Sequence, residues 1–332
     1  MLRRLKNIWR PENFHLQHWV GRGRPCFEGW YFKLVDAQGR QPYAIIPGVF
    51  LGNDAHAFIQ VLDGQAGTSA YHRFALADFR ADAERFDVWI GRSRFNRHAI
   101  SLAIDAGETS AGQAAHGTVH FSTWKGWPVT LTHPGVMGPY SFVPLMECNH
   151  GILSMDHELS GELVVGNDRT SFQNGRGYIE KDWGRGFPSG YVWAQSTHFQ
   201  EEGVSISASV ARIPWLKGSF RGYLIGFLLR DKLHRFTTYT GAEIEHIAVD
   251  DHTYHLTVRD KTHRLALRAS KSGGALLHAP YDKQMVARVA ETMTSRVELC
   301  FESLVDRKVL FEGEGEHGCL EVQGDLDAIL HG

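Results

Sequence analysis

The sequence has few cysteines, and none of them is spaced as a paired metal or redox motif. The four cysteines are Cys26, Cys148, Cys300 and Cys319, and no CxxC pair occurs. These gaps suit neither a zinc site nor a dense disulfide framework, so a reduced cytoplasmic chain is the simpler prediction. No apolar run approaches the roughly 18 residues that a membrane-spanning helix needs.

The signatures of several enzyme classes are also missing. The chain contains no GxSxG nucleophile elbow and no HExxH zinc motif. The short glycine motifs at Gly21 and Gly175 lack the rest of a dinucleotide-binding fingerprint, and no βαβ alternation surrounds them. His150 and His157 lie seven positions apart, which is no diagnostic ligand spacing. We therefore expect no nucleotide cofactor and no resident metal.

Charge is nearly balanced along the chain as a whole. The formal net charge is −2, so bulk charge does not draw the protein toward nucleic acid. The N-terminus is locally basic, because Arg3, Arg4 and Lys6 flank an apolar set made of Leu2, Leu5, Ile8 and Trp9. This pattern predicts peripheral contact with an anionic membrane surface such as the inner membrane. The alternative is a frayed terminus or a short helix packed on the body.

What the sequence does contain is a long succession of β-type segments separated by turn residues. About fifteen short alternating or β-branched runs can be counted, beginning with Gly29–Val35. Only Tyr281–Met293, which follows Pro280, has apolar residues at helical spacing. The pattern predicts an all-β protein with two antiparallel barrels or sandwiches and one C-terminal helix. We expect the domains to span residues 20–185 and 186–332.

One stretch, GYIEKDWGRGFPSGYVWAQ from Gly177 to Gln195, is both acidic and aromatic. On a strand Glu180 and Asp182 share one face, while Lys181 points to the other. A carboxyl group among aromatic rings has a raised pKa, because burial disfavours its charged form, and can donate a proton at neutral pH. The alternative is architectural, with the carboxylates capping backbone N–H groups or binding Arg176 or Arg185.

Four segments of the chain resemble the tocopherol cyclase-like family. In order, they read FEGWYFKL, YAIIPGVFLG with AFIQVLDG, GPYSFVPLMECNHGILSMDHELSG, and the acidic-aromatic stretch. The resemblance implies two lipocalin-like β-barrel domains, one for each predicted domain. It also implies an isomerase-type activity of vitamin E biosynthesis, in which the chromanol ring of a prenylated benzoquinol is closed without a redox cofactor.

If this chemistry applies, a buried acid protonates the alkene nearest the quinol ring, and the phenol oxygen attacks the resulting cation. We expect Asp182 or Glu180 to be the acid, with Glu28 and Glu147 as further candidates. The expected substrate-binding residues are aromatic or polar members of the same motifs: Trp30, Tyr31, Asn149, His150, Trp183, Tyr191, Trp193 and Gln195. Tryptophan faces would stabilise the cation, and the polar groups would orient the quinol hydroxyls.

A second hypothesis is a non-catalytic, lipocalin-type binding protein for prenyl quinones, carotenoids or other lipids. It needs an apolar cavity but no proton donor. A third is a hydratase that adds water to an isoprenoid alkene with the same acid. The environment of the carboxyl groups separates these readings, since a carboxylate locked against arginine favours the binder.

Overall fold

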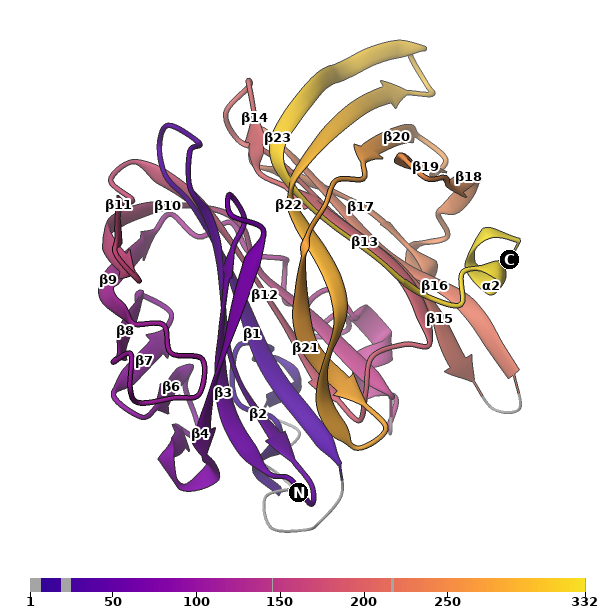
Figure 1. Cartoon of the computed structure of the whole chain (residues 1–332). Coiled ribbons are helices and arrows are strands. Elements are labelled where there is room, and N and C mark those ends of the chain that lie inside the picture. The colour runs from indigo at the N-terminus through magenta and orange to yellow at the C-terminus, as the bar shows by residue number, and fades with distance from the viewer. Residues whose placement is uncertain (1–6, 19–24, 145, 216–217, 332) are drawn as a thin grey trace. The chain divides into compact units, whose positions relative to one another are not determined.

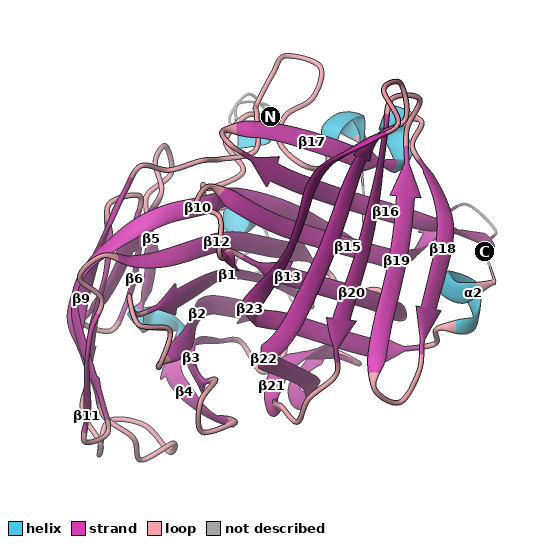
Figure 2. Cartoon of the chain, turned by 90° about the horizontal axis from the view of Figure 1, so that it is seen from above, coloured by secondary structure: helices cyan, strands magenta, loops and turns pink. Residues whose placement is uncertain are grey.

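Antiparallel strands dominate the computed structural model, which describes residues 7–18, 25–144, 146–215 and 218–331 (Figure 1). Figure 2 shows the same chain with only a few short helical turns among the strands. Within the described residues the strands form two antiparallel sheets. The prediction of an all-β protein built from two lipocalin-like parts is confirmed.

The first sheet runs in the order β4-β3-β2-β1-β12-β10-β9-β8-β7-β6-β5, and β11 pairs with β10. Most neighbours in this order are also consecutive in the chain, as expected for hairpin connections. Its strands are β1 (Cys26–Val35), β2 (Pro42–Leu51), β3 (His56–Asp63), β4 (Thr68–Ala75), β5 (Phe79–Ala81), β6 (Asp87–Ile90), β7 (Ser93–Asn96), β8 (Ala99–Ile104), β9 (Ala115–Ser122), β10 (Cys148–Val165), β11 (Asp168–Ser171) and β12 (Gly175–Gly184).

The second sheet runs in the order β17-β16-β15-β13-β23-β22-β20-β19-β18. Two further strands lie off this path, since β14 pairs with β23 and β21 pairs with β22. Its strands are β13 (Gly190–Ser196), β14 (His198–Phe199), β15 (Val204–Trp215), β16 (Gly218–Leu229), β17 (Lys232–Thr237), β18 (Glu243–Val249), β19 (Thr253–Arg259), β20 (His263–Ser270), β21 (Ala275–Tyr281), β22 (Gln284–Ser303) and β23 (Lys308–Gly324).

Helical structure is confined to short pieces. One short C-terminal helix is present, α2 (Asp327–Leu330), although it is not the segment predicted to be helical. No helix in the described ranges is long and apolar enough to cross a membrane. Asn7 and Ile8 are also helical, and the described residues include the 3₁₀ turns η1 (Leu16–His18), η2 (Leu76–Asp78), η3 (Gly138–Phe142) and η4 (Thr238–Thr240).

The position predicted for the helix, Tyr281–Met293, was wrong, because this segment is a β-hairpin. Strand β21 ends at Tyr281, and β22 begins at Gln284. The two residues between them, Asp282 and Lys283, have φ of 40° and 70°, as a two-residue type I′ turn requires. The apolar spacing misled because Val289 and Met293 lie four positions apart, which is compatible with one face of a strand as well as one face of a helix.

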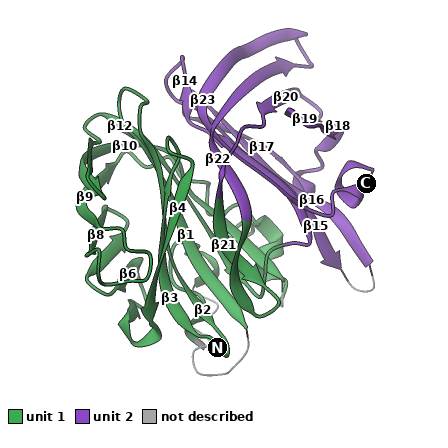
Figure 3. Ribbon diagram, in the orientation of Figure 1, with its two compact units in different colours: residues 1–187, 276–288 green, residues 188–275, 289–332 purple. Residues whose placement is uncertain are grey.

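Contacts between residues divide the chain into two compact units (Figure 3). Unit 1 comprises residues 1–187 and 276–288, and unit 2 comprises residues 188–275 and 289–332. The first unit is thus made of two separate segments of the chain. The domain boundary expected between residues 185 and 186 stays a prediction. Gln60 on β3 holds the hairpin in unit 1: its Nε2 donates to the His278 carbonyl at 2.9 Å, and its Oε1 accepts from the His278 N–H at 2.7 Å.

The core of unit 1 lies on one face of the β1–β12 pair and is filled by aromatic rings. Phe32 packs within 5.8–6.3 Å, centroid to centroid, of Phe86, Phe95 and Phe121. Trp30, two residues earlier on the same face, is fully buried and stacks on Phe86 at 5.7 Å. Burial of each such side chain contributes about 1.5–3 kcal/mol, so this face stabilises the strand register strongly.

The same interior face carries a fully buried ion pair. Lys181 Nζ lies 2.5 Å from Glu28 Oε1, and neither side chain is exposed. The ammonium also donates to the carbonyl oxygens of Pro11 and Asn13. Glu28 accepts from the backbone N–H of His15 at 2.8 Å. These bonds offset the cost of removing both charges from water, and they hold the N-terminal segment against β1 and β12.

Glu28→Gln should destabilise the protein by about 3–5 kcal/mol, because Lys181 would remain as a buried charge without its carboxylate. Urea unfolding of the two proteins measures the difference. The matched control is Glu298→Gln, whose partner Arg268 lies at 2.8 Å with both side chains about half exposed. The control should lose less than about 1 kcal/mol, and equal losses would contradict a structural role for the buried pair.

Replacing Asp282-Lys283 by Asn-Gly should raise the free energy of unfolding by about 1 kcal/mol, since these residues adopt positive φ at lower cost. Thermal or urea unfolding reports the change. A helix over the same residues predicts the opposite sign, because glycine inside a helix costs about 1 kcal/mol.

Candidate functional site

The site lies on three adjacent strands of unit 1, where β12 runs between β1 and β10. On one side Glu180 is opposite Tyr31, and on the other Asp182 is opposite His150. Lys181 is paired with Trp30 instead and points to the interior, as the alternation of the strand predicts. Glu180 and Asp182 therefore lie on the face of β12 opposite the aromatic core.

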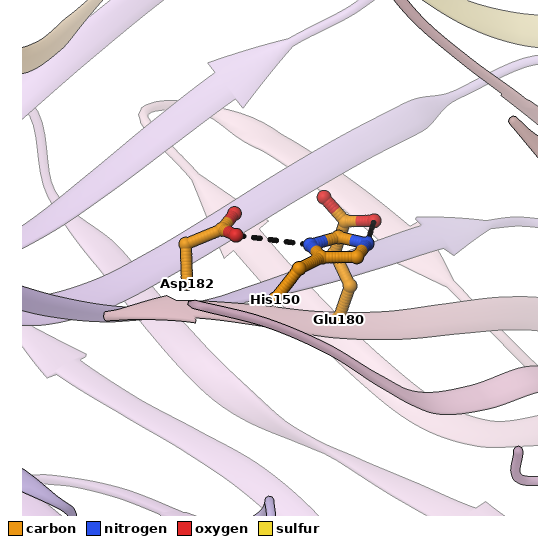
Figure 4. A group of neighbouring side chains, drawn as sticks. All are labelled: His150, Glu180 and Asp182. Carbon is orange, nitrogen blue, oxygen red and sulfur yellow. Dashed lines mark hydrogen bonds and ion pairs between the residues drawn. The ribbon is translucent and has the colours of Figure 1, made fainter. Parts of the chain in front are cut away.

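His150 lies between the two carboxylates, and Figure 4 shows its ring with one nitrogen turned toward each. The Nδ1 atom is 2.9 Å from Asp182 Oδ1, and Nε2 is 3.7 Å from Glu180 Oε2. Tyr178, two residues before Glu180, donates its hydroxyl to Glu180 Oε2 at 2.5 Å. We call Tyr178, Glu180, Asp182 and His150 the β12 cluster.

The charge of the β12 cluster follows from this geometry. Burial by itself would lower the pKa of His150, but the negative charges of Asp182 and Glu180 outweigh it and raise that pKa to about 9. The imidazole is therefore a cation at neutral pH, with both ring nitrogens protonated. The nearby Cys148 thiol, whose Sγ is 3.9 Å from Asp182 Oδ1, has its pKa raised by burial and by Asp182, so it stays protonated.

Cation binding is a second use of these donor types. In the described ranges His150, Glu180 and Asp182 form the one group of three such side chains whose ligand atoms all lie within 4.8 Å of one another. A histidine must lose a proton before it can bind a metal, and the raised pKa of His150 opposes that loss. The arrangement favours proton chemistry, while the absence of a resident metal stays a prediction.

Four predicted site residues lie on the core side of the sheet instead. Glu28 is paired with Lys181, whose positive charge outweighs burial and lowers the pKa of the Glu28 carboxyl. Glu28 is thus engaged by Lys181 on the core side, away from the β12 cluster, and its role as the acid stays a prediction. The other three are also engaged there: Trp30 and Trp183 each have a ring centroid 4.7 Å from Lys181 Nζ, and Asn149 Nδ2 donates to the Trp183 carbonyl at 3.2 Å.

Two further predicted residues lie beside the β12 cluster in the sequence or the sheet. Tyr31 is the β1 neighbour of Glu180 and is 8% exposed. Glu147 immediately precedes β10, and burial raises the pKa of its carboxyl while Arg185 acts in the other direction. Glu147 therefore remains a second candidate acid.

Tyr191, Trp193 and Gln195 belong to unit 2 and follow one another on alternate positions of β13. The intervening residues Val192 and Ala194 belong to the core of that unit, so the three predicted residues share the opposite face of the strand. The Tyr191 hydroxyl donates to Glu321 Oε2 at 2.6 Å. Their role in substrate binding stays a prediction.

The environment of the acids bears on the alternatives drawn from the sequence. Arg176, one of the two arginines considered as their partner, binds Asp156, with Nη2 2.8 Å from Oδ2. The nearest cation to Asp182 in the β12 cluster is the imidazolium of His150, which can give up a proton, whereas a guanidinium cannot. Tyr178 was missed from the sequence, although its spacing of two from Glu180 places both on one face of a strand.

Stability should depend on pH through His150. Its folded pKa of about 9 exceeds the unfolded value of 6.5, so the stabilisation is complete below pH 6.5 and is lost as pH rises through about 9. The shift corresponds to on the order of 3 kcal/mol. Urea unfolding between these pH values should show this fall in the wild type and a flatter profile in His150→Gln. The exposed His120→Gln serves as control, and a wild-type slope retained in His150→Gln would contradict the assignment.

Comparison with known proteins gives matches over most of the chain. The tocopherol cyclase-like family model matches residues 92–324. A relative described as "Probable tocopherol cyclase, chloroplastic", from Oryza sativa subsp. japonica, is 24% identical over 315 residues, which cover 79% of this chain and 67% of the relative.

Solved structures of CghA share the fold at low sequence identity. The crystal structure of CghA with Sch210972 aligns with a TM-score of 0.58 and 10% identity, over 91% of this chain and 89% of that one. Kievitone hydratase from Nectria haematococca aligns with a TM-score of 0.47 and 11% identity, over 92% and 90%. Because the family model spans well over half of the sequence, including β10, β12 and the whole β12 cluster, the chain belongs to the tocopherol cyclase-like family.

Proposed function

We propose that this protein is a cyclase that closes a prenylated benzoquinol, or a related isoprenoid alkene, to a chromanol by acid catalysis without a cofactor. The observation that carries the proposal is the imidazolium of His150 held between Asp182 and Glu180 on the face away from the core. Family membership and the rice relative support the class of reaction. Fold similarity alone would not, since one fold hosts many chemistries.

Asp182 is the acid in this proposal because it is the most exposed of the three charged groups. Its side chain is 26% exposed, compared with 13% for His150 and 8% for Glu180. A proton moves from His150 Nδ1 to Asp182 Oδ1 along their 2.9 Å hydrogen bond, which leaves a neutral imidazole and a neutral carboxylic acid. A carboxylic acid is a far stronger proton donor than an imidazolium, as protonation of an alkene demands.

The ring closure then balances without any other reactant. The Asp182 proton adds to the less substituted alkene carbon, and the alkene electron pair forms the new C–H bond. The tertiary cation accepts a lone pair from the phenol oxygen, which forms the C–O bond of the chromanol ring. The phenol proton passes to the vacated Asp182 carboxylate and from there to His150, so the site ends as it began.

Glu180 and Tyr178 act through His150 in this scheme. When His150 gives up its Nδ1 proton, the remaining proton stays on Nε2, which faces Glu180 Oε2 at 3.7 Å. Tyr178 donates to that same oxygen at 2.5 Å and so fixes the carboxylate in place. Both are positioning residues. They hold His150 in the tautomer with its proton on Nε2, so that Nδ1 can take a proton back from Asp182.

Aromatic groups for the cation must come from the outer face of the strands. Tyr31 flanks Glu180 there. The substrate-binding role of Tyr191, Trp193 and Gln195, which lie on β13 of unit 2, stays a separate prediction. Trp30 and Trp183 are not assigned this role, because their ring faces are engaged by Lys181. Holding the prenyl chain folded over the ring lowers the entropic part of the barrier.

The test is incubation of the purified protein with a phytyl- or geranylgeranyl-benzoquinol, followed by chromatography for the chromanol. Asp182→Asn should lower the rate by about 10²–10⁴-fold, the range for removal of a general acid. Tyr178→Phe should keep most activity but narrow the pH range over which His150 supplies a proton. Glu158→Gln, an exposed acid on β10, is the matched control and should leave the rate unchanged.

Three results would contradict the proposal. Bound substrate that is never converted identifies a lipid-binding protein, the alternative considered from the sequence. A tertiary alcohol instead of a chromanol identifies water as the nucleophile and the protein as a hydratase. Full activity in Asp182→Asn removes Asp182 as the acid and transfers the test to Glu147→Gln.

A further inference from the structure

The connection between β9 and β10 exposes apolar side chains to solvent. Leu131 is 80% exposed, Phe142 is 46% exposed and Val129 is 43% exposed. No acidic residue occurs from Ser122 to Met146, in a chain that has 37 of them. A contiguous exposed apolar patch is typical of a site that binds another protein or a membrane.

This patch is built into the fold. Trp127 and Val136, on either side of Leu131 in the sequence, are 4% and 1% exposed and anchor the connection. Between them the Thr130 N–H donates to the His133 carbonyl at 2.9 Å, which closes a turn around Leu131. Leu131 thus lies at the tip of a hydrogen-bonded turn, and the backbone of this turn directs its side chain into solvent.

The N-terminal segment joins the same patch. Trp9 donates its indole N–H to the Leu131 carbonyl at 3.1 Å, and its ring lies 5.8 Å from that of Phe142 in an edge-on arrangement. Arg10, the next residue, is exposed. Residues 1–11 include Arg3, Arg4, Lys6 and Arg10 but no acid. Up to Pro11 every charged residue of this part of the sequence is basic, and Arg10 is the one among them that the structure describes, directly after Trp9 of the patch.

We propose that Trp9, Val129, Leu131 and Phe142 form a docking patch that inserts into the headgroup region of an anionic lipid bilayer. Apolar side chains beside basic residues are the combination that binds such a surface, with the apolar groups buried and the bases attracted to lipid phosphates. A second copy of the chain is a poorer partner, because a symmetric contact would bring like charges together.

The purpose that we assign to the docking patch depends on the proposed function. A prenylated quinol partitions into bilayers, so an enzyme that takes it from the membrane must approach that surface. The chain runs from Phe142 in the patch to Cys148 at the start of β10 within six residues. His150 of the β12 cluster follows two residues later, so membrane contact and the site are adjacent along the chain.

Co-sedimentation of the full chain with vesicles tests the docking patch. The wild type should bind phosphatidylglycerol–phosphatidylcholine vesicles and bind pure phosphatidylcholine vesicles more weakly, with the difference reduced by salt. Leu131→Ser/Phe142→Ser should lower the partition coefficient at least about tenfold, as expected for losing two inserted apolar side chains. Val305→Ser/Leu310→Ser, whose originals are 71% and 40% exposed in unit 2, should bind like the wild type.

Several results would overturn the docking patch. These are equal vesicle binding by Leu131→Ser/Phe142→Ser and the wild type, an equal loss in the Val305→Ser/Leu310→Ser control, or no binding by the wild type. A wild-type dimer that the Leu131→Ser/Phe142→Ser variant converts to a monomer, without vesicle binding, identifies a self-association surface instead.

The cyclase assay separates this proposal from the proposed function. With substrate in detergent micelles the Leu131→Ser/Phe142→Ser variant should form chromanol at the wild-type rate, and with substrate in vesicles it should be slower. Vesicle binding lost in the variant, with no chromanol from the wild type in either medium, would refute the cyclase but leave the docking patch standing.

Discussion

The strict alternation of β12 is the constraint on which the rest of unit 1 depends. Lys181 points into the core and meets Glu28, while Glu180 and Asp182 point the other way and meet His150. A one-residue slip of β12 would turn Lys181 to the face of His150. It would also bury Glu180 and Asp182 against the aromatic rings of the core. The cost of unpaired buried charge on either face therefore fixes the register of β12 against β1 and β10.

This constraint separates two uses of charge that look alike in the sequence. On the core face the carboxylate of Glu28 is matched by Lys181, His15 and backbone N–H groups, so it is held ionised and serves architecture. On the other face two carboxylates share one histidine, and their negative charges raise its pKa. The buried ion pair lies on the same strand as Glu180 and Asp182, so the register that it favours also brings these two acids to His150.

Much of this could be predicted from the sequence, because strand alternation is a local property. The all-β class, the shared face of Glu180 and Asp182 and the opposite direction of Lys181 all follow from a period of two. The direction of Trp30 and Trp183 could have followed too, but their place in an aromatic motif suggested substrate contact. Only the register of β1 against β12 shows that both face Lys181.

Other features could not be predicted, since they depend on contacts between distant residues. The backbone N–H of His15, just before the 3₁₀ turn η1, donates to Glu28, which is 13 positions away. Gln60 and His278 form a hydrogen bond across 218 positions. The hairpin at Asp282-Lys283 was missed because Lys283 is not a typical type I′ turn residue, and the apolar spacing nearby also fits a helix. His150 was expected to orient the substrate, and its position between two acids is visible only in the structure.

The central claim is that His150 is a cation held between two carboxylates, and nitrogen NMR of histidine-labelled protein tests it most directly. His150→Gln assigns the signal by its disappearance. The account predicts that both ring nitrogens stay protonated through neutral pH and titrate with a midpoint near the pKa of about 9. A neutral ring at pH 7, or a midpoint at the ordinary histidine value of roughly 6.5, would contradict it.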